Sequence, residues 1–425
     1  MFPDVGRVPR FFVFVVVVTL FCPAIPAAAQ QRLPLTITEA GDLALAGEPG
    51  AAALLDSADA LQERAVAAGQ LPDPMMRVGL ANYPISGGGF TTEGMTQAQL
   101  GFRQAFPRAR SLESDQFESQ ARALTFNADA RKRDVLQATR HAWLDTYYAQ
   151  QAEALLTESR PFFADLVAIT RSLYSVGRKS QHDVLRADLE LSRLDDRLIE
   201  TSRVRESSRA MLSRWLGAEA YRPLAMTLPA WQDVPALEQL RERLTAHPAL
   251  AAADAGVGAR QAAVRVAEER KKPGWALDVG YGYRDGYLPS GEPRSDFVSV
   301  AVTVDLPLFS ENRQDRRLAA ALSERRAALN TQADLEARLG SELNAEYARW
   351  QDLVRRLELY ETRLLEQSRS QVEAALLAYQ SDAGDFADVM RAYIDDLDAR
   401  IAYLHLQVDQ AKSYAVLANL GGLEQ

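Results

Sequence analysis

The chain has 425 residues, of which 47% are hydrophobic and 25% are charged, and this balance excludes an intrinsically disordered protein. Its formal net charge is −9 at pH 7, so it lacks the basic footprint of a nucleic-acid-binding protein. The only cysteine, Cys22, lies in an N-terminal leader, which excludes disulfides and zinc–cysteine sites from the rest of the chain.

Residues 1–29 have the three parts of a secretory signal peptide. Arg7 and Arg10 supply the positive start, and an apolar core and an Ala-Ala-Ala cleavage site follow. The apolar core is too short to span a bilayer as a helix. Leucine and phenylalanine precede Cys22, where lipoprotein processing prefers a small residue, so lipidation of Cys22 is not expected. We therefore predict an exported protein.

The rest of the chain repeats one pattern at an offset of about 200 residues. Residues 183–187 (Asp-Val-Leu-Arg-Ala) recur as residues 388–392 (Asp-Val-Met-Arg-Ala), a shift of 205. Further matches follow in the same order, at shifts of 199 to 205, between Pro49 and Pro248, Pro74 and Pro273, Pro107 and Pro307, Tyr174 and Tyr379, Leu212 and Leu417, and Gly217 and Gly422. This pattern indicates a duplicated unit.

Each unit contains very long stretches that favour helix. Residues 111–160, 178–216 and 385–420 lack both glycine and proline, and residues 311–383 are interrupted only by Gly340. At 1.5 Å per residue, the longest stretch would reach on the order of 100 Å. The last stretch has a heptad seam, typical of coiled coils, formed by Met390, Ile394, Leu397, Ile401, Leu404, Val408, Ala411, Ala415 and Ala418. We predict coiled-coil helices.

Before each set of long helices, the hydrophobic pattern alternates with a period of two residues, as in β-strands. Apolar and polar or small residues alternate over residues 275–284 and 298–306, with weaker copies over 76–80 and 99–106. Val300 and Val302 belong to the apolar set, and Thr303 belongs to the polar set. Strands of this kind suit either a membrane β-barrel or a hairpin on a soluble core, and the signal peptide and flanking aromatic residues favour the membrane.

Four strands in one chain cannot close a barrel. Single-chain barrels have at least about eight strands, and open strand edges do not occur in lipid. The sequence therefore predicts that several chains contribute strands to one barrel.

This arrangement resembles the TolC family of outer-membrane efflux ducts over nearly all of residues 34–425. The resemblance depends on residues 71–74 (Leu-Pro-Asp-Pro) before the first strand, and on residues 104–107 (Gln-Ala-Phe-Pro) and 305–309 (Asp-Leu-Pro-Leu-Phe) after the second and fourth. Tyr174 and Gly177, followed by Asp183, resemble the family's hairpin tip. The family implies a homotrimer with a twelve-stranded barrel, continued through the periplasm by coiled helices.

Two short segments resemble the heavy-metal branch of the family, the relatives of CusC and CzcC. These are residues 82–84 (Asn-Tyr-Pro) and 95–97 (Met-Thr-Gln). The resemblance implies export of copper, silver, zinc, cobalt or cadmium. The chain departs from this branch at its N-terminus, because many of those relatives are lipoproteins.

The resemblance places the functional constriction at the tips of two helical hairpins. It implies that Tyr379 and Asp183 link adjacent helix pairs, and that Asp388 lies in the narrowest ring. In a threefold assembly an acidic residue that faces the lumen becomes a ring of three, which favours cations. A solvated acidic helix face is the alternative. Gly384 aligns with a position where the family can carry a basic gate residue. The candidate residues are Tyr174, Gly177, Asp183, Tyr379, Asp382, Asp385 and Asp388.

No constellation of residues predicts an enzyme, a cofactor or a metal site. His141, His182, His247 and His405 are scattered without metal-site spacing, and no catalytic triad or phosphate-binding glycine loop is present. The family implies a periplasmic adaptor protein, an RND-type inner-membrane pump and outer-membrane lipid as partners, with no nucleic acid. The alternative is a periplasmic adaptor or structural coiled-coil protein of an export complex, and an exported hydrolase is a distant third.

The predicted class is mainly α, a long coiled-coil tube with four strands per chain for a trimeric transmembrane barrel in the bacterial outer membrane. Its predicted parts are a signal peptide (1–29), an N-terminal helical segment (30–74), strands 1 and 2 (75–107), the first hairpin (108–217), an equatorial linker and helix (218–272), strands 3 and 4 (273–308) and the second hairpin (309–425).

Overall fold

A computed structural model describes residues 33–231, 233–381 and 383–423. The predicted signal peptide and Asp382 lie outside these residues. The chain is mainly helical with one four-stranded sheet, which confirms the predicted fold class. The elements are α1 Ile37–Ala46, α2 Pro49–Gly69, β1 Met75–Ala81, β2 Gln97–Phe106, α3 Arg110–Ser175, α4 Gln181–Leu216, η1 Gly217–Tyr221, α5 Leu237–Leu244, α6 Pro248–Glu269, β3 Trp275–Tyr283, β4 Phe297–Val304, α7 Gln314–Leu359, η2 Tyr360–Leu364, α8 Leu365–Gln380 and α9 Phe386–Gly421.

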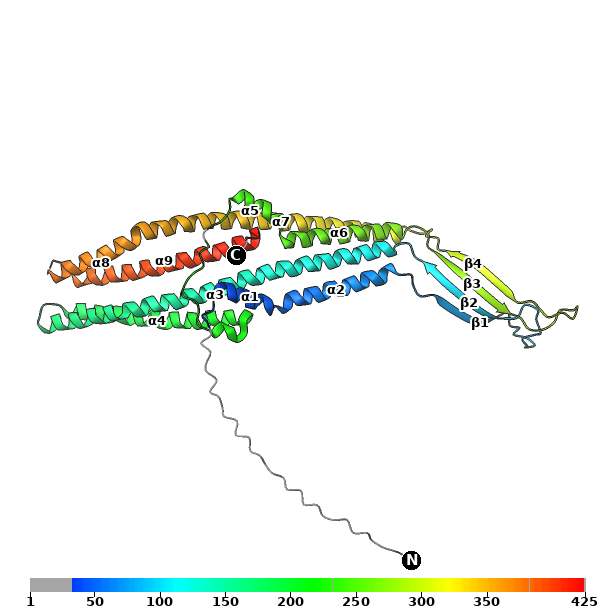
Figure 1. Ribbon diagram of the computed structural model, residues 1–425, viewed down its shortest axis with the longest axis horizontal. Coiled ribbons are helices and arrows are strands. Elements are labelled where there is room, and N and C mark those ends of the chain that lie inside the picture. The colour runs from blue at the N-terminus through cyan, green and yellow to red at the C-terminus, as the bar shows by residue number, and fades with distance from the viewer. Residues whose placement is uncertain (1–32, 232, 382, 424–425) are drawn as a thin grey trace, which may run out of the picture.

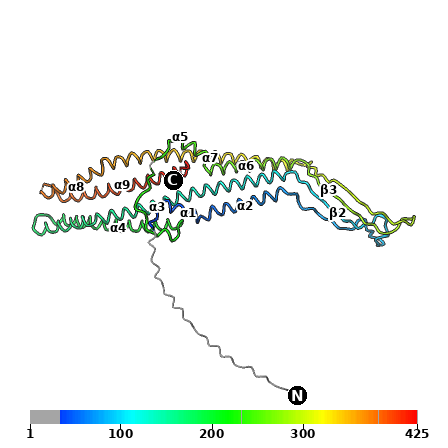
Figure 2. The backbone as a smooth tube through the Cα atoms, viewed as in Figure 1, coloured from blue at the N-terminus to red at the C-terminus, as the bar shows by residue number. Residues whose placement is uncertain are grey.

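The molecule is elongated, with the sheet at one end and two helical hairpin tips at the other (Figure 1). The first hairpin is α3 with α4, and the second is α7 and α8 with α9, and the two lie side by side (Figure 2). The short helices α1 and α5 and the end of α9 gather near the middle. Among the described residues, no helix has both the length and the apolar character needed to cross a membrane.

The sheet is antiparallel in the order β1-β2-β3-β4, and its two faces differ in chemistry. One face carries apolar rows, such as Met76, Phe102, Val279 and Val300, and Val300 is 68% exposed. The other face carries small and polar residues. There Asp278 accepts a hydrogen bond of 2.7 Å from the Thr303 hydroxyl and lies 3.8 Å from Arg103. The alternation therefore places Val300 and Thr303 on opposite faces, as the sequence predicted.

The long helix α3 has 66 residues and continues through Pro161, beyond the proline-free stretch recognised in the sequence. A proline inside a helix removes one backbone hydrogen bond and costs about 3 kcal/mol. Packing compensates here, because Phe163 and Leu166, just beyond the proline, are buried in a cluster shared with α4 and α9. Tertiary contacts thus extend the helix to the tip.

The duplication is visible in the lengths of the helices. Arg110 and Gln314, which begin α3 and α7, are 204 residues apart, whereas Ser175 and Gln380, which end α3 and α8, are 205 apart. The second copy therefore holds one extra residue. A π-helical turn over Tyr360–Leu364 joins α7 to α8, and such a turn accommodates an inserted residue without ending the helix.

The heptad seam of α9 faces the interior. Its members Met390, Leu397 and Leu404 are buried, as are the smaller residues that follow them toward the C-terminus. The helix packs on α3 of the first hairpin and on α7 and α8 of its own. The seam thus joins the two halves of the chain.

Candidate gate at the helical tips

The first tip reverses the chain through a glycine. Gly177 has a φ of +74°, a conformation that costs little only for glycine. Its N–H donates to the carbonyl of Tyr174 (3.0 Å), and the Arg178 N–H donates to the carbonyl of Leu173 (2.9 Å). This pair of bonds is a Schellman motif, which satisfies the last carbonyls of α3.

Asp183 secures the start of α4. Ser180 is the N-cap, and its backbone N–H and hydroxyl both donate to the Asp183 carboxylate, at 3.0 and 2.8 Å. The Asp183 N–H donates back to the Ser180 hydroxyl at 3.3 Å, which completes a capping box. The hydrogen bond from the Ser180 side chain, with Lys179 and His182 nearby, lowers the pKa of Asp183.

Replacing Ser180 with alanine is expected to destabilise the first turn of α4 by about 1 kcal/mol, the usual cost of losing an N-cap. Hydrogen exchange of residues 181–184 should accelerate. Gln181→Ala, an exposed residue beside the cap, is the control and should leave exchange unchanged. Because the pKa of Asp183 is lowered on folding, its contribution is full above the unfolded pKa near 3.8 and is lost as pH falls through the folded pKa. Equal exchange at acidic and neutral pH, corrected for intrinsic rates, would contradict this role.

The second tip repeats the backbone bond of the first. The Ala383 N–H donates to the Ala378 carbonyl at 2.9 Å, the bond that Arg178 and Leu173 make 205 residues earlier. Gly384 follows, and a Cβ there would lie 2.9 Å from the Ala378 Cβ and 3.2 Å from its carbonyl carbon. Close packing of the turn therefore requires glycine at 384.

Lys179 joins the two tips within the chain. Its ammonium nitrogen lies 5.0 Å from the centre of the Tyr379 ring and 3.9 Å from a carboxylate oxygen of Asp385, the N-cap of α9. Tyr379 also packs edge-on against Phe386, with ring centres 5.9 Å apart. At the offset of 205, Lys179 corresponds to Gly384, so the second tip has no equivalent lysine.

The remaining acidic residues lie along α9. Asp388 is exposed and pairs at 3.4 Å with Arg391, one turn along the same helix. Farther from the tip, Asp396 accepts a hydrogen bond of 2.7 Å from Ser368, and Asp398 pairs with Arg197 of α4 at 2.9 Å. The structure therefore brings Lys179, Tyr379 and Asp385 together, with Asp388 one turn away. Tyr174 is exposed at the first tip.

Lys179 was not among the residues predicted from the sequence. The signal that could have identified it is the duplication itself, because the two tips align and only one of them carries a lysine before its N-cap.

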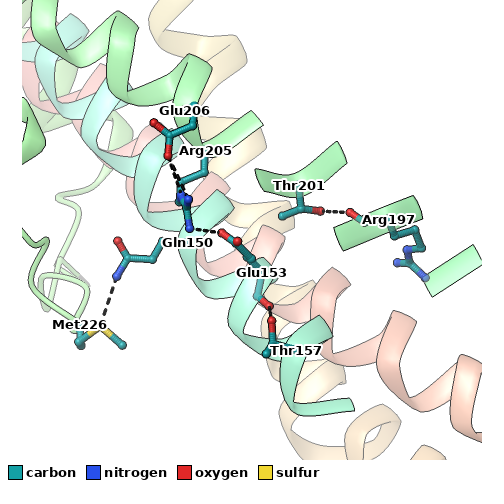
Figure 3. A network of polar contacts seen from close by, with 8 residues as sticks. All are labelled: Gln150, Glu153, Thr157, Arg197, Thr201, Arg205, Glu206 and Met226. Atoms are coloured by element: carbon teal, nitrogen blue, oxygen red, sulfur yellow. Dashed lines mark hydrogen bonds and ion pairs between the residues drawn. The ribbon is translucent and has the colours of Figure 1, made fainter. Parts of the chain in front are cut away.

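A polar network holds the first hairpin together nearer the middle of the molecule (Figure 3). Arg205 of α4 pairs with Glu153 of α3 at 2.5 Å and with Glu206 at 3.0 Å. Gln150 of α3 points to Met226 in the linker after η1, with its amide nitrogen 3.6 Å from the sulfur. These contacts hold α3 against α4 and the linker, and so stabilise the part of the first hairpin nearest the middle of the molecule.

Two of the four histidines, His247 and His141, pack between helices. His247 is the N-cap of α6 and accepts a hydrogen bond from the Ala249 N–H at 3.2 Å, and burial lowers its pKa. His141 lies 3.2 Å from the Lys412 carbonyl oxygen, and burial lowers its pKa as well. In the part of the chain that the structure describes, no three histidine, cysteine or carboxylate side chains gather in a metal-binding group.

The chain is elongated, with a four-stranded sheet at one end and paired helical tips at the other. Residues 240–423 match the family model described as outer membrane efflux protein. The chain is 28% identical over 306 residues to protein CyaE of Bordetella pertussis, a match that covers 68% of this chain and 62% of that relative. The matched region thus spans under two thirds of the relative's length.

Solved structures of channels share the fold across nearly the whole chain. The outer-membrane channel OprN has a TM-score of 0.74 at 19% identity, with 91% of this chain and 90% of that one covered. For CusC the TM-score is 0.77 at 15% identity, with 92% of each chain covered. For the CmeC outer membrane channel of Campylobacter jejuni it is 0.75 at 15% identity, with 92% and 86% covered.

The second half of the chain thus resembles outer membrane efflux proteins, and the whole chain shares the fold of solved outer-membrane channels. CusC, OprN and CmeC are matched about equally well, so the branch within the family is not resolved.

Proposed function

We propose that the protein is the outer membrane channel subunit of a tripartite efflux system, in which three copies form one duct. The observation that carries this proposal is the sheet, which exposes an apolar face and leaves β1 and β4 each paired on one side only. Backbone groups at such edges have to be hydrogen-bonded inside a bilayer. Pairing β1 of one copy with β4 of the next closes a barrel and satisfies both edges.

The duplicated helices also support association with further copies. On α9, Met390 and Leu404 are 1% and 7% exposed because they pack inside the chain. Their equivalents on α4 at the offset of 205 are Leu185 and Ile199, which are 61% and 72% exposed. The helix α9 packs on α3 of the other hairpin. In the duplication α4 corresponds to α9, so the exposed face of α4 lacks a neighbour equivalent to α3. In the duplicated pattern that neighbour is α7 and α8 of a second copy.

The assembly is tested by the mass of the purified protein in mild detergent. We expect three chains per particle, because four strands per chain give twelve in a closed barrel. Leu185→Glu should weaken assembly by placing a charge in the subunit contact, whereas His182→Glu, exposed one turn earlier, should not. A stable monomer, or extraction without any detergent, would favour the alternative of a periplasmic adaptor.

We infer that the duct works with a periplasmic adaptor protein and an inner-membrane pump of the RND type, and that heavy-metal cations are its substrate. Residues 82–84 and 95–97, which resemble the metal branch, and the shared fold with CusC support this substrate. The two segments also contact each other, because Asn82 donates to the Met95 carbonyl at 3.2 Å and Thr96 donates to the Asn82 carbonyl at 2.9 Å. These hydrogen bonds close the loop between β1 and β2, so some of the residues that carry the resemblance have a structural role.

The substrate is tested in a strain that lacks the gene. Copper, zinc and cadmium should each be compared with uncharged antibiotics for growth inhibition, with and without the gene restored. Greater sensitivity to metals alone supports the metal substrate, whereas sensitivity to antibiotics alone contradicts it and leaves the channel intact.

We propose that Asp388, with Asp385 and Asp382, forms the cation-selective constriction of the duct, beside the tip residues Tyr174, Gly177, Asp183 and Tyr379. Three copies would bring three Asp388 carboxylates toward the axis, and such a ring attracts multivalent cations. Asp388→Asn is therefore expected to weaken the block of single-channel current by multivalent cations. Asp395→Asn, an exposed acid farther along α9, is the control. If Asp388→Asn left both block and selectivity unchanged, the acidic residues would form a solvated outer face.

A further inference from the structure

A buried arginine near the middle of the molecule makes no ion pair with any residue that the structure describes. Arg140 of α3 is only 5% exposed, and its Nε has no hydrogen-bond partner. Its guanidinium lies 5.3 Å from the centre of the Trp231 ring. Within residues 33–231, 233–381 and 383–423, no ion pair or hydrogen bond of this guanidinium is described. A buried charge is costly unless it is paired and hydrogen-bonded, so this arginine requires an explanation.

Arg140 lines a cavity of about 340 Å³, whose walls come from α1, the middle of α3 and the end of α9. Arg133, one heptad earlier on α3, lines the same cavity and donates one hydrogen bond of 3.1 Å to the Asn419 carbonyl. Asp42 is the single acidic residue among the described lining residues, so the cavity carries a net charge of about +1. The small side chains Ala415 and Ala418 leave the space open.

Both arginines remain cations at neutral pH. Burial lowers the pKa of Arg140 to about 10, and Asp42 and Tyr414 act in the opposite direction. Burial also lowers the pKa of Arg133, against the nearby Asp129. The cavity therefore presents two positive groups to a site that is partly shielded from water.

We propose that this cavity binds a compact oxyanion, a phosphate or a carboxylate, on Arg140 and Arg133. A guanidinium presents a planar fork of N–H donors that matches two oxygens of such an anion. Gln137 and Asn419 also line the cavity, where the Asn419 amide nitrogen donates to Gln137 Oε1 at 2.6 Å and to Asp134 at 3.1 Å. A volume near 340 Å³ accommodates an oxyanion carried by a small solute. The bound anion would join α1, α3 and α9, which belong to both halves of the chain.

The experiment measures binding of inorganic phosphate to the purified full-length protein in detergent. Phosphate should raise the melting temperature in a saturable way, compared with chloride at equal ionic strength, and acetate is titrated in parallel to separate phosphate from carboxylate recognition. Arg140→Gln is expected to weaken the apparent affinity at least about tenfold, since hydrogen bonds to charged groups contribute about 1.5–3 kcal/mol. Arg122→Gln, an exposed arginine on the same helix, is the matched control and should bind as the wild type does.

Two further variants make the result decisive. Arg140→Lys keeps the charge without the fork and should bind with intermediate affinity. Arg133→Gln should also weaken binding, and it tests the site should Arg140→Gln fail to assemble. The proposal is overturned when neither phosphate nor acetate stabilises the wild type more than chloride does. It is equally overturned when the variants at 140 and 133 that fold bind as tightly as Arg122→Gln.

Discussion

Replacing Val300 with arginine is expected to prevent stable insertion of the protein into the outer membrane. Val300 is central in β4, is 68% exposed, and lies in an apolar row with Val279 and Phe102. An arginine on the lipid face near the bilayer midplane costs about 2–4 kcal/mol in each copy, and a trimer would incur this cost three times. The measurement is the fraction of protein recovered in the outer membrane rather than in periplasmic aggregates.

Ser299→Arg is the matched control, one residue earlier on the same strand. Ser299 lies on the polar face, in a row with Gly280, Gly101 and Arg77, so an arginine there should leave insertion unchanged. Thr303 is a poorer control, because its hydroxyl donates to Asp278 and any substitution disturbs that contact. Equal loss from Val300→Arg and Ser299→Arg would indicate a hairpin with two buried faces, and would contradict the lipid-facing assignment.

The division of the sheet into two faces could be predicted from the sequence because it depends only on a period of two. Side chains at Val298, Val300 and Val302 must share a face in any strand, whatever surrounds the strand. The long helices were equally predictable, since heptad spacing from Met390 onward fixes which side of α9 is buried. Both features are local patterns that repeat many times.

Features that depend on distant packing could not be predicted in this way. The passage of α3 through Pro161 depends on contacts with α4 and α9. The burial of Arg140 could not be predicted, because in the sequence it is an ordinary charged residue of an amphipathic helix. The structure shows that α1 and α9 lie beside it. The tip residues named from the sequence came from a resemblance, and their roles remain proposals.

Replacing Lys179 with methionine is expected to open the closed duct more often. Lys179 is the side chain that the structure places between Tyr379 and Asp385, and it joins the two hairpin tips of one chain. Methionine keeps much of the aliphatic stem but removes the charge. A cation over an aromatic ring contributes roughly 0.5–1 kcal/mol at an exposed site. Three copies would each lose this contact, so the open fraction in planar-bilayer recordings should rise several-fold.

The adjacent residue provides the control for this prediction. Arg178 is exposed and adjoins Lys179 in the sequence. Arg178→Met removes an equal charge and should leave the open fraction unchanged. Tyr379→Leu should raise the open fraction as Lys179→Met does, because it removes the ring. The double variant should then have less effect than the two single changes added together, since both remove the contact between Lys179 and Tyr379. Full additivity of the two changes, or an equal effect of Arg178→Met, would show that general charge at the tip controls opening and that the contact between Lys179 and Tyr379 does not.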